Sequence, residues 1–293
     1  MLRSRRMEQH IKEAGNDFAG ENSMEKKPEP RKRASKEEKP QHIQRRLVES
    51  VNELPFDEFI NRYVPPRIHD FSISVPRLTT TPTDLGTYDT YSIEMYSSSS
   101  ISLEDLESCF LLVKLTSSEM YKNSAGGWSP KKKKNEMKLL DLRYMLLVRT
   151  TTGQGQDQNS SKNTGSPVTG GRAVGGFLAF MVTYEDGFEV IYCYEIHLAP
   201  ELQHKGLGKI LFGFYEEIGR KIGVQKAMLT LFKANKAAIR FYERLGYGRD
   251  EFSPKPMKLR NGNTREYDYM IFSKDLGGMQ TIKKDTNNMD IVL

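Results

Sequence analysis

The chain has 293 residues, of which 37% are hydrophobic and 28% charged, with a formal net charge of +6 and a mean hydropathy of −0.61. No run approaches the roughly 18 apolar residues that span a bilayer, and the first residues lack the apolar stretch of a secretory signal. Cys109 and Cys193 are too few for a disulfide scaffold or a multi-cysteine zinc module, and the histidines lack metal-binding spacing, so we expect a soluble intracellular protein without metal or membrane partner.

The positive charge is concentrated at the start of the chain. Residues 1–46 hold 13 Lys and Arg against 8 Asp and Glu, whereas the rest of the chain holds 31 against 30. Residues 1–40 have few β-branched or aromatic side chains, which predicts a disordered basic tail. The basic run Lys26–Lys39 fits either a nuclear import signal or an ordinary solvated charge run. Because the body is nearly neutral, we expect no direct nucleic-acid partner despite the sequence pI of about 9.1.

Residues 41–84 predict a helical extension and a linker ahead of the main domain. Arg45–Tyr63 has helical spacing that Pro55 interrupts, and two consecutive prolines end the pattern. We expect this segment to pack as an N-terminal helix against a domain over residues 85–275, with a tail over residues 276–293.

The main domain alternates between predicted strands and helices. The predicted strands are Tyr88–Tyr96, Arg143–Arg149, Gly175–Tyr184, Glu189–Leu198, Ala227–Phe232, a strand near Tyr247, and Glu266–Ser273. The predicted helices are Leu103–Tyr121, Gly206–Ile222 and Asn235–Leu245. Residues 150–173, mostly Gly, Ser, Thr, Gln and Asn, predict a flexible insertion in a surface hairpin loop. This order predicts an α/β fold of the mixed-sheet (α+β) kind, with one central sheet.

The run QHKGLG, Gln203–Gly208, follows a predicted strand and begins a helix. The free backbone N–H groups and the positive dipole end of a helix start bind pyrophosphate well, and glycines let a phosphate approach the backbone. Lys205 and Lys209 add positive charge. On its own, this pattern is better read as an ordinary loop-to-helix junction.

A second run, NKAAIRFYERLGY, covers Asn235–Tyr247 after the next predicted strand. Asn235 begins a helix, and Ala237 and Ala238 leave a thin helix face for a pantetheine arm. Tyr242 lies one turn before the helix ends at Gly246.

Together these two runs resemble the GNAT superfamily of N-acetyltransferases, whose motifs are Q/R-x-x-G-x-G/A and N-x-x-A-x-x-x-Y-x-x-x-G-F/Y. The resemblance covers Tyr88 to Ser273 and implies the GNAT acyl-CoA N-acyltransferase fold, with acetyl-CoA as co-substrate. The implied acetyl-CoA contacts are Ile196, His197, Leu198, Gln203, His204, Lys205, Gly206, Leu207, Gly208, Lys209 and Asn235.

Four further runs resemble the NatD family within that superfamily: IYCYEIHL from Ile191, KGLGK from Lys205, MLTLFK from Met228 and EMYKNSAGGW from Glu119. NatD enzymes acetylate the N-terminal amine of core histones of types 4 and 2A, which begin Ser-Gly-Arg-Gly. The resemblance implies that activity here, and we expect a monomer in nucleus and cytoplasm. Two departures affect the substrate pocket: Gly126 stands where a tryptophan is expected, and Thr183 where an Asp is expected.

The resemblance implies that Glu195 is the general base, directly or through a water, with Tyr192 and Tyr194 beside it. Strict strand alternation would place Glu195 and the two tyrosines on opposite faces, so a β-bulge is required. We expect burial to raise the pKa of Glu195, and Tyr242 to protonate the departing thiolate. Cys193 is a weaker candidate as a nucleophile because it has no basic neighbour in sequence. Without the motifs, Glu195 would be read as a salt-bridged edge residue and both tyrosines as sheet packing.

The resemblance also assigns contacts to the acceptor peptide, whose Arg and Lys call for acidic partners. The assigned residues are Tyr121, Trp128, Thr183, Glu185, Tyr194, Thr230 and Tyr269. Two alternatives stay open: a GNAT enzyme acting on lysine or other amines, and a catalytically silent module that binds acetyl-CoA or chromatin.

Overall fold

The computed structural model describes residues 47–76, 88–150, 172–258, 262 and 264–277. The predicted N-terminal tail, nearly all of the predicted insertion and most of the predicted C-terminal tail lie outside the described residues. The described helices are α2 (Leu47–Asn52), α3 (Phe56–Tyr63), α4 (Leu103–Lys122), α5 (Pro130–Glu136), α6 (Leu207–Ile222) and α7 (Lys236–Arg244), with 3-10 turns η1 (Pro66–Ile68) and η3 (Pro200–Leu202). The strands are β1 (Ser72–Pro76), β2 (Tyr88–Ser97), β3 (Arg143–Thr150), β4 (Ala173–Glu185), β5 (Phe188–Leu198), β6 (Lys226–Phe232), β7 (Gly248–Arg249), β8 (Met257–Lys258), β9 (Thr264–Arg265) and β10 (Tyr269–Asp275).

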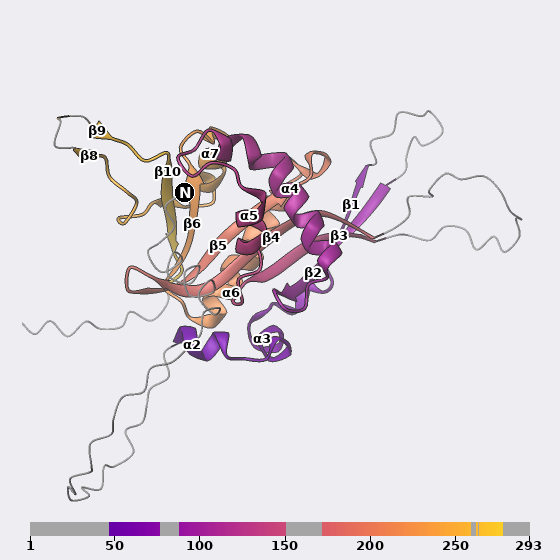
Figure 1. Ribbon diagram of the computed structural model, residues 1–293. Coiled ribbons are helices and arrows are strands. Elements are labelled where there is room, and N and C mark those ends of the chain that lie inside the picture. Colours follow the sequence, from indigo (N-terminus) through magenta and orange to yellow (C-terminus); the bar gives the residue numbers. More distant parts are fainter. Residues whose placement is uncertain (1–46, 77–87, 151–171, 259–261, 263, 278–293) are drawn as a thin grey trace, which may run out of the picture.

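One mixed sheet organises the domain, with strand order β1-β2-β3-β4-β5-β6-β10-β7 (Figure 1). β5 and β6 are parallel, and the other neighbouring pairs are antiparallel. A crossover through α6 joins β5 to β6, as a parallel pair requires. β8 and β9 form a separate two-stranded sheet. The predicted mixed α/β layout with one central sheet is confirmed.

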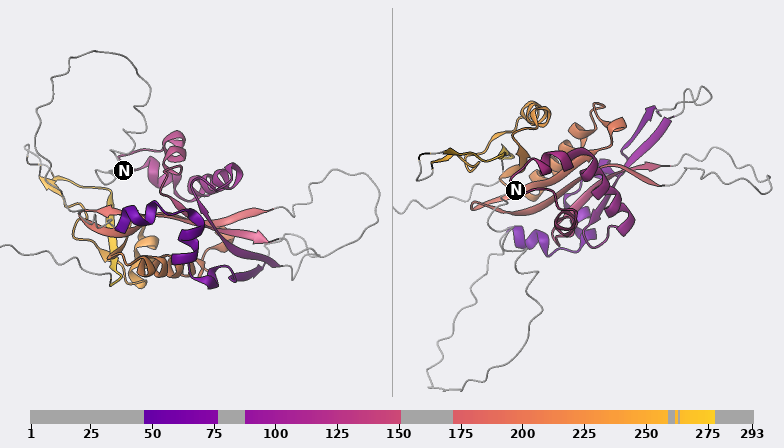
Figure 2. Two further views of the ribbon diagram at one scale, coloured as in Figure 1. Left: turned by 90° about the horizontal axis from the view of Figure 1, so that it is seen from below. Right: turned by 45° about the horizontal axis from the view of Figure 1, so that its top comes forward.

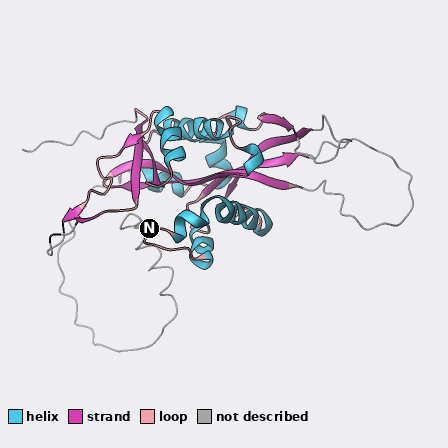
Figure 3. Cartoon of the chain, turned by 90° about the horizontal axis from the view of Figure 1, so that it is seen from above, coloured by secondary structure: helices cyan, strands magenta, loops and turns pink. Residues whose placement is uncertain are grey.

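Helices cover both faces of this sheet (Figures 2 and 3). α4 packs on one face with the side chains of Tyr144 and Leu146, and α6 packs on the other with those of Met145 and Leu147. This double cover explains why β3 reads as an unbroken apolar run rather than an alternating one. None of the described helices combines the length and apolar character that a membrane-spanning helix requires.

The N-terminal extension differs from the single predicted helix, because it forms two helices separated at Pro55. The proline ring fixes an extended backbone at the N-cap of α3 (φ −52°, ψ 144°), which ends the first helix and begins the second. Phe59 of α3 is fully buried, and its ring centroid lies 6.5 Å from that of Phe180 in the sheet. β1, inside the predicted linker, pairs with β2 and was not predicted. The extension is therefore built into the domain.

The sheet's other predicted elements lie within a few residues of their expected bounds. A two-residue turn joins β4 to β5, and its Asp186 and Gly187 have φ of 48° and 88°, a conformation that Asp-Gly favours. β10 starts at Tyr269 rather than Glu266, and Leu276, placed in the predicted tail, is 9% exposed and packs in the core.

Two glycines on α6 give a matched test of how this helix packs against the sheet. A Cβ at Gly219 would lie 2.6 Å from Leu276 and 2.8 Å from Ile191, whereas a Cβ at Gly213 would meet nothing within 4 Å. We expect Gly219→Ala to destabilise the domain by about 1–3 kcal/mol through overpacking. Gly213→Ala should stabilise it by about 0.5–1 kcal/mol through helix propensity. Urea unfolding measures both, and changes of the same sign would contradict this packing.

Candidate active site

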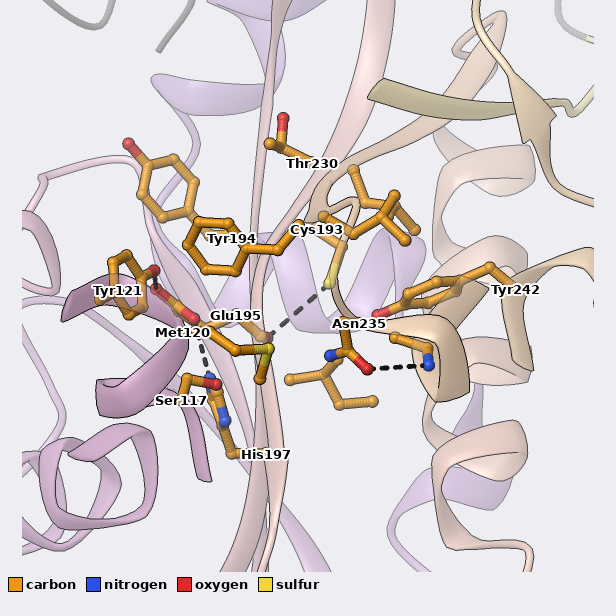
Figure 4. A pocket seen from close by; sticks show the side chains of 15 residues that line it. Ser117, Met120, Tyr121, Cys193, Tyr194, Glu195, His197, Thr230, Asn235 and Tyr242 are labelled. Carbon is orange, nitrogen blue, oxygen red and sulfur yellow. Dashed lines mark hydrogen bonds and ion pairs between the residues drawn. The ribbon is translucent and has the colours of Figure 1, made fainter. Parts of the chain in front are cut away.

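The candidate site lies where two parallel strands separate. Within the described sheet, β5 and β6 pair from Val190 opposite Lys226 to Cys193 opposite Leu229, and beyond that point they diverge. The cleft between them has a volume of about 580 Å³, counted out to its open mouth. Residues 193–197 of β5 line one wall and residues 229–232 of β6 the other, with α4 and α7 at the two ends (Figure 4). A ligand in this cleft can contact the backbone edges of both strands.

The β-bulge that the sequence required is present in β5. Phe180 pairs with Cys193 and Ala179 pairs with Glu195, so Tyr194 is the extra residue between them. Tyr192 packs with the α4 face of the sheet, and beyond the bulge Glu195 contacts residues of α4 and α5 on that same face. The bulge therefore brings Glu195 to the side of the tyrosines, as predicted.

Glu195 sits at the centre of a buried charged cluster. Its side chain is 9% exposed; its Oε1 atom is 2.6 Å from Nζ of Lys133, and its Oε2 atom is 2.8 Å from Nε2 of His197. The hydroxyl of Tyr121 lies 3.4 Å from Oε1. Nζ of Lys133 is also 3.0 Å from Oε2 of Glu136, so the cluster contains both positively and negatively charged side chains.

The pKa of Glu195 is shifted down, opposite to the expected direction. Burial by itself raises this pKa, but the charge of Lys133 and the hydrogen bond and charge of His197 more than offset burial. The carboxylate therefore stays ionised at pH values well below those at which a glutamate usually takes up a proton. The expectation of a raised pKa was wrong because it counted burial without the cation that α5 supplies.

Lys133 is the site residue that the sequence analysis missed. It lies in α5, which begins with the hydroxyl of Ser129 accepting from the amide of Lys132 and with Pro130 in the first turn. The Ser-Pro pair is a helix-start signal, but four consecutive lysines read as a solvated run. Lys133 alone among these four is buried, at 4% exposed, and it donates to the Tyr121 hydroxyl at 2.7 Å.

The acceptor end of the cleft contains several of the predicted substrate residues. Tyr121 and Thr230 line the cleft together with Tyr194, and the hydroxyls of Thr230 and Tyr192 share a hydrogen bond. The Trp128 ring stacks on that of Phe110, with 6.0 Å between the ring centroids, and its centroid is 5.5 Å from that of Tyr121. Trp128 therefore packs behind Tyr121 and does not line the cleft itself.

Three other predicted substrate residues lie beside the cleft, outside its lining. Thr183 is paired with Val190, and Tyr269 with Phe232, which places both on the α4 face of the sheet. Glu185 is buried, 6% exposed, at the β4–β5 turn, and its charge helps to raise the pKa of Tyr192, although burial is the larger cause. A peptide longer than one residue would have to extend from the cleft toward this turn to meet them.

The predicted phosphate loop leaves the start of α6 open. Gly206 is the N-cap of α6 with φ of 80°, where a Cβ would be strained, and no atom lies within 4 Å of that Cβ position. His204 also has a positive φ, 61°, and Gln203 closes the loop by donating to the carbonyl of Leu198 at 3.0 Å. The exposed Lys205 and Lys209 flank this open helix start, which fits a bound phosphate group.

The second motif meets the cleft from α7. The side chain of Asn235 caps the helix by accepting from the amide of Ala238 at 3.1 Å, and both residues line the cleft with Tyr242. Gly208 of α6 faces α7, because a Cβ there would lie 3.2 Å from the Phe241 ring. Leu207 is buried beneath the loop. Asn235, Ala238 and Tyr242 thus line one end of the cleft, whereas the residues of the first motif lie outside the lining and adjoin α7 through Gly208.

Burial keeps two groups in the cleft protonated. It raises the pKa of the Tyr242 phenol well above its usual value, so that phenol is a proton donor across the neutral range. It also raises the pKa of the Cys193 thiol, which removes the thiolate a nucleophilic cysteine needs. In the described part of the chain, no group of three or more His, Cys, Asp or Glu is arranged to hold a metal ion.

Comparison with known proteins gives a match to one family model and a set of solved structures. The family model described as "Acetyltransferase (GNAT) family" matches residues 155–247, which include the phosphate loop and α7. Among solved structures, the ribosomal-protein-S18-alanine N-acetyltransferase from Escherichia coli is 18% identical, with a TM-score of 0.38 over 65% of this chain and 97% of that one. PaiA N-acetyltransferase from Thermoplasma acidophilum, in complex with coenzyme A, is 19% identical (TM-score 0.40, 63% and 99%). NAA60 of Arabidopsis thaliana, in complex with a bisubstrate analogue, is 14% identical (TM-score 0.38, 64% and 100%).

Proposed function

We propose that this chain, which contains a GNAT acetyltransferase domain, transfers acetyl from acetyl-CoA to the N-terminal α-amine of Ser-starting proteins of the type 4 and type 2A histone class. The observation that carries the proposal is the ionised Glu195 in the cleft between diverging strands. Tyr121, Tyr194 and Thr230 surround its acceptor end, and Asn235 and Tyr242 line the other end, while the loop around Gly206 begins the helix that packs against α7. A histone substrate is consistent with a monomer that works in nucleus and cytoplasm.

Acetyl-CoA supplies an activated acetyl thioester, and the residues of the chain provide the proton transfers and the polar contacts. In this mechanism Glu195 accepts the proton that the amine loses while the C–N bond forms. An α-amine has a pKa of about 7.7–8.0 in water, so a sizeable fraction is already neutral near pH 7.5. The nitrogen loses its basicity as its lone pair enters the new amide bond, so a carboxylate of low pKa can accept the proton.

The departure of the thiolate depends on the protonated phenol of Tyr242 and on the backbone of β5. The C–S bond breaks as the C–N bond forms, and Tyr242 supplies the proton that the departing sulfur takes up. Backbone N–H groups at residues 196–198 lie on the part of β5 beyond its pairing with β6, where they can hold the carbonyl oxygen. No covalent acetyl-enzyme is required, which agrees with the protonated state of Cys193.

Acidic residues near the acceptor end support a cationic peptide. Glu185 is buried at the β4–β5 turn, and Asp186 next to it is exposed. We assign to this turn the contact with an Arg at the third position of the acceptor. The turn therefore favours a peptide that begins Ser-Gly-Arg-Gly over a neutral one.

A peptide panel tests the proposal. We expect acetylation at the α-amine of Ser-Gly-Arg-Gly peptides, with no product from the same peptide carrying a blocked N-terminus, and mass spectrometry locates the acetyl group. Replacing the peptide Arg by Ala should raise KM about tenfold, as expected for one lost charge-assisted hydrogen bond. Acetylation confined to internal lysines would overturn the α-amine assignment, and binding of acetyl-CoA without turnover would indicate a silent module.

A variant of Glu185 distinguishes loss of the contact with the peptide Arg from a general loss of peptide binding. Glu185→Gln should raise KM for the Arg-containing peptide by a similar factor and change little for the Arg-to-Ala peptide. Equal effects on both peptides would show that Glu185 does not contact the acceptor Arg.

A further inference from the structure

The hydroxyl of Tyr121 is held between two charged side chains at the acceptor end of the cleft. Its oxygen is 2.7 Å from Nζ of Lys133 and 3.4 Å from Oε1 of Glu195. The Tyr121 ring contacts two other rings, with its centroid 5.5 Å from that of Trp128 and 5.1 Å from that of Phe232. Figure 4 shows the hydroxyl beside the Glu195 carboxylate. Tyr121 is therefore held both at its ring and at its oxygen, on the wall of the cleft.

The ammonium group of Lys133 sets the direction of its hydrogen bond with Tyr121. An ammonium group has three protons to donate and no lone pair with which to accept. Nζ of Lys133 is also 2.6 Å from Oε1 of Glu195 and 3.0 Å from Oε2 of Glu136, so its three protons point at three oxygen atoms. The Tyr121 oxygen therefore accepts from Lys133, and the single phenolic proton points away from the ammonium group.

The phenolic proton of Tyr121 makes only a long contact with Glu195. The distance of 3.4 Å between the hydroxyl and Oε1 exceeds the usual 2.5–3.0 Å of a hydrogen bond between two oxygen atoms, so this contact is weak. A ligand oxygen in the cleft can take the same proton at the usual length. The hydroxyl then turns from Glu195, and Oε1 can accept from a donor of the ligand instead.

We propose that Lys133 is a positioning residue that orients the Tyr121 hydroxyl as a donor to the carbonyl oxygen next to the reacting amine of the acceptor. This role rests on the proposed function, in which that amine gives its proton to Glu195. In an N-terminal residue the amine nitrogen and the carbonyl oxygen are roughly 3 Å apart, because only Cα and the carbonyl carbon separate them. The Tyr121 hydroxyl and Oε1 of Glu195 are a donor and an acceptor at a comparable spacing of 3.4 Å. The two groups are therefore complementary to an α-amino carbonyl group.

This arrangement separates a peptide α-amine from other amines by chemistry. The side-chain amine of lysine and the amines of polyamines have methylene groups as neighbours and no carbonyl oxygen at that distance. An amine of this kind leaves the Tyr121 hydroxyl with its long contact to Glu195 and gains no hydrogen bond from it. One hydrogen bond between uncharged partners corresponds to a preference of about fivefold to tenfold for the peptide α-amine.

Two peptides that differ at one bond test the proposal. One begins Ser-Gly-Arg-Gly, and in the other a trans carbon–carbon double bond replaces the first amide, which keeps the shape and removes the carbonyl oxygen. Isothermal titration calorimetry of the protein saturated with CoA, which carries no acetyl group to transfer, gives the ratio of the two dissociation constants. Tyr121→Phe keeps the ring and loses the hydroxyl, so it should lower the preference for the amide peptide about fivefold to tenfold. Tyr88→Phe, at a strand residue that is 56% exposed, is the matched control and should keep the wild-type ratio.

Lys133→Met tests the positioning itself, because the Tyr121 hydroxyl keeps its proton and loses the group that orients it. The ratio of two dissociation constants does not depend on how much of the protein is folded, so a lower stability of this variant leaves it readable. We expect the ratio to fall toward that of Tyr121→Phe. A wild-type ratio in either Tyr121→Phe or Lys133→Met overturns the proposal, even if peptides are acetylated. A wild-type protein that acetylates no α-amine overturns the proposed function instead, and with it this role.

Discussion

Replacing Lys133 with Met is expected to destabilise the domain by about 3 kcal/mol, because the Glu195 carboxylate would lose its closest cation inside the protein. The two atoms are 2.6 Å apart, and the side chains are 4% and 9% exposed. Thermal or urea unfolding at neutral pH measures the loss. Lys134→Met is the matched control: its partner Glu107 is at 2.6 Å, but both side chains are more than two-fifths exposed. We expect that change to cost less than about 1 kcal/mol, and equal losses for the two variants would contradict the buried pair.

The same substitution has a defined pH dependence. In the folded wild type the pKa of Glu195 lies below the ordinary glutamate value of about 4.3, so its charged interactions stabilise the fold above that pH. This stabilisation is lost as the pH falls toward the folded-state pKa. Lys133→Met should raise the folded-state pKa and so weaken the loss of stability on acidification. An unchanged acid dependence would show that Lys133 does not hold the carboxylate.

Glu195→Gln should lower kcat about 10²- to 10⁴-fold, because the amide cannot accept the proton of the amine. The dissociation constant of acetyl-CoA should change less than about twofold, since the phosphate loop and α7 are untouched; isothermal titration calorimetry measures it. Glu217→Gln, on the opposite side of the sheet in α6, is the matched control for a surface carboxylate paired with an arginine. Wild-type turnover by Glu195→Gln would remove Glu195 from the chemistry and leave it a structural role.

The elements predictable from sequence were those whose signals are local. Asn235, predicted to begin a helix, caps α7 in the structure. The same kind of local signal marks Ser102, which caps α4, and the Asp186-Gly187 turn. The bulge at Tyr194 was predictable in another way, because the proposed chemistry required Glu195 and the tyrosines on one face.

What could not be predicted depends on contacts between distant segments. Lys133 lies 62 positions from Glu195 in the chain, and nothing in four consecutive lysines shows which one turns inward. The direction of the Glu195 pKa depended on that contact, so a sequence that suggested burial gave the wrong sign. Trp128 was expected at the pocket wall, and its place behind Tyr121 follows from stacking on Phe110 of α4.

The single extra residue at Tyr194 reverses the parity of β5 from that point on. Before it, even-numbered positions such as Tyr192 face α4; after it, odd-numbered positions such as Glu195 and His197 do. A regular pleat that kept every residue of the strand would instead turn Glu195 and His197 into the hydrocarbon packed under α6. The α4 face therefore receives Glu195 and His197 only because β5 places one residue more than β4 does at this point.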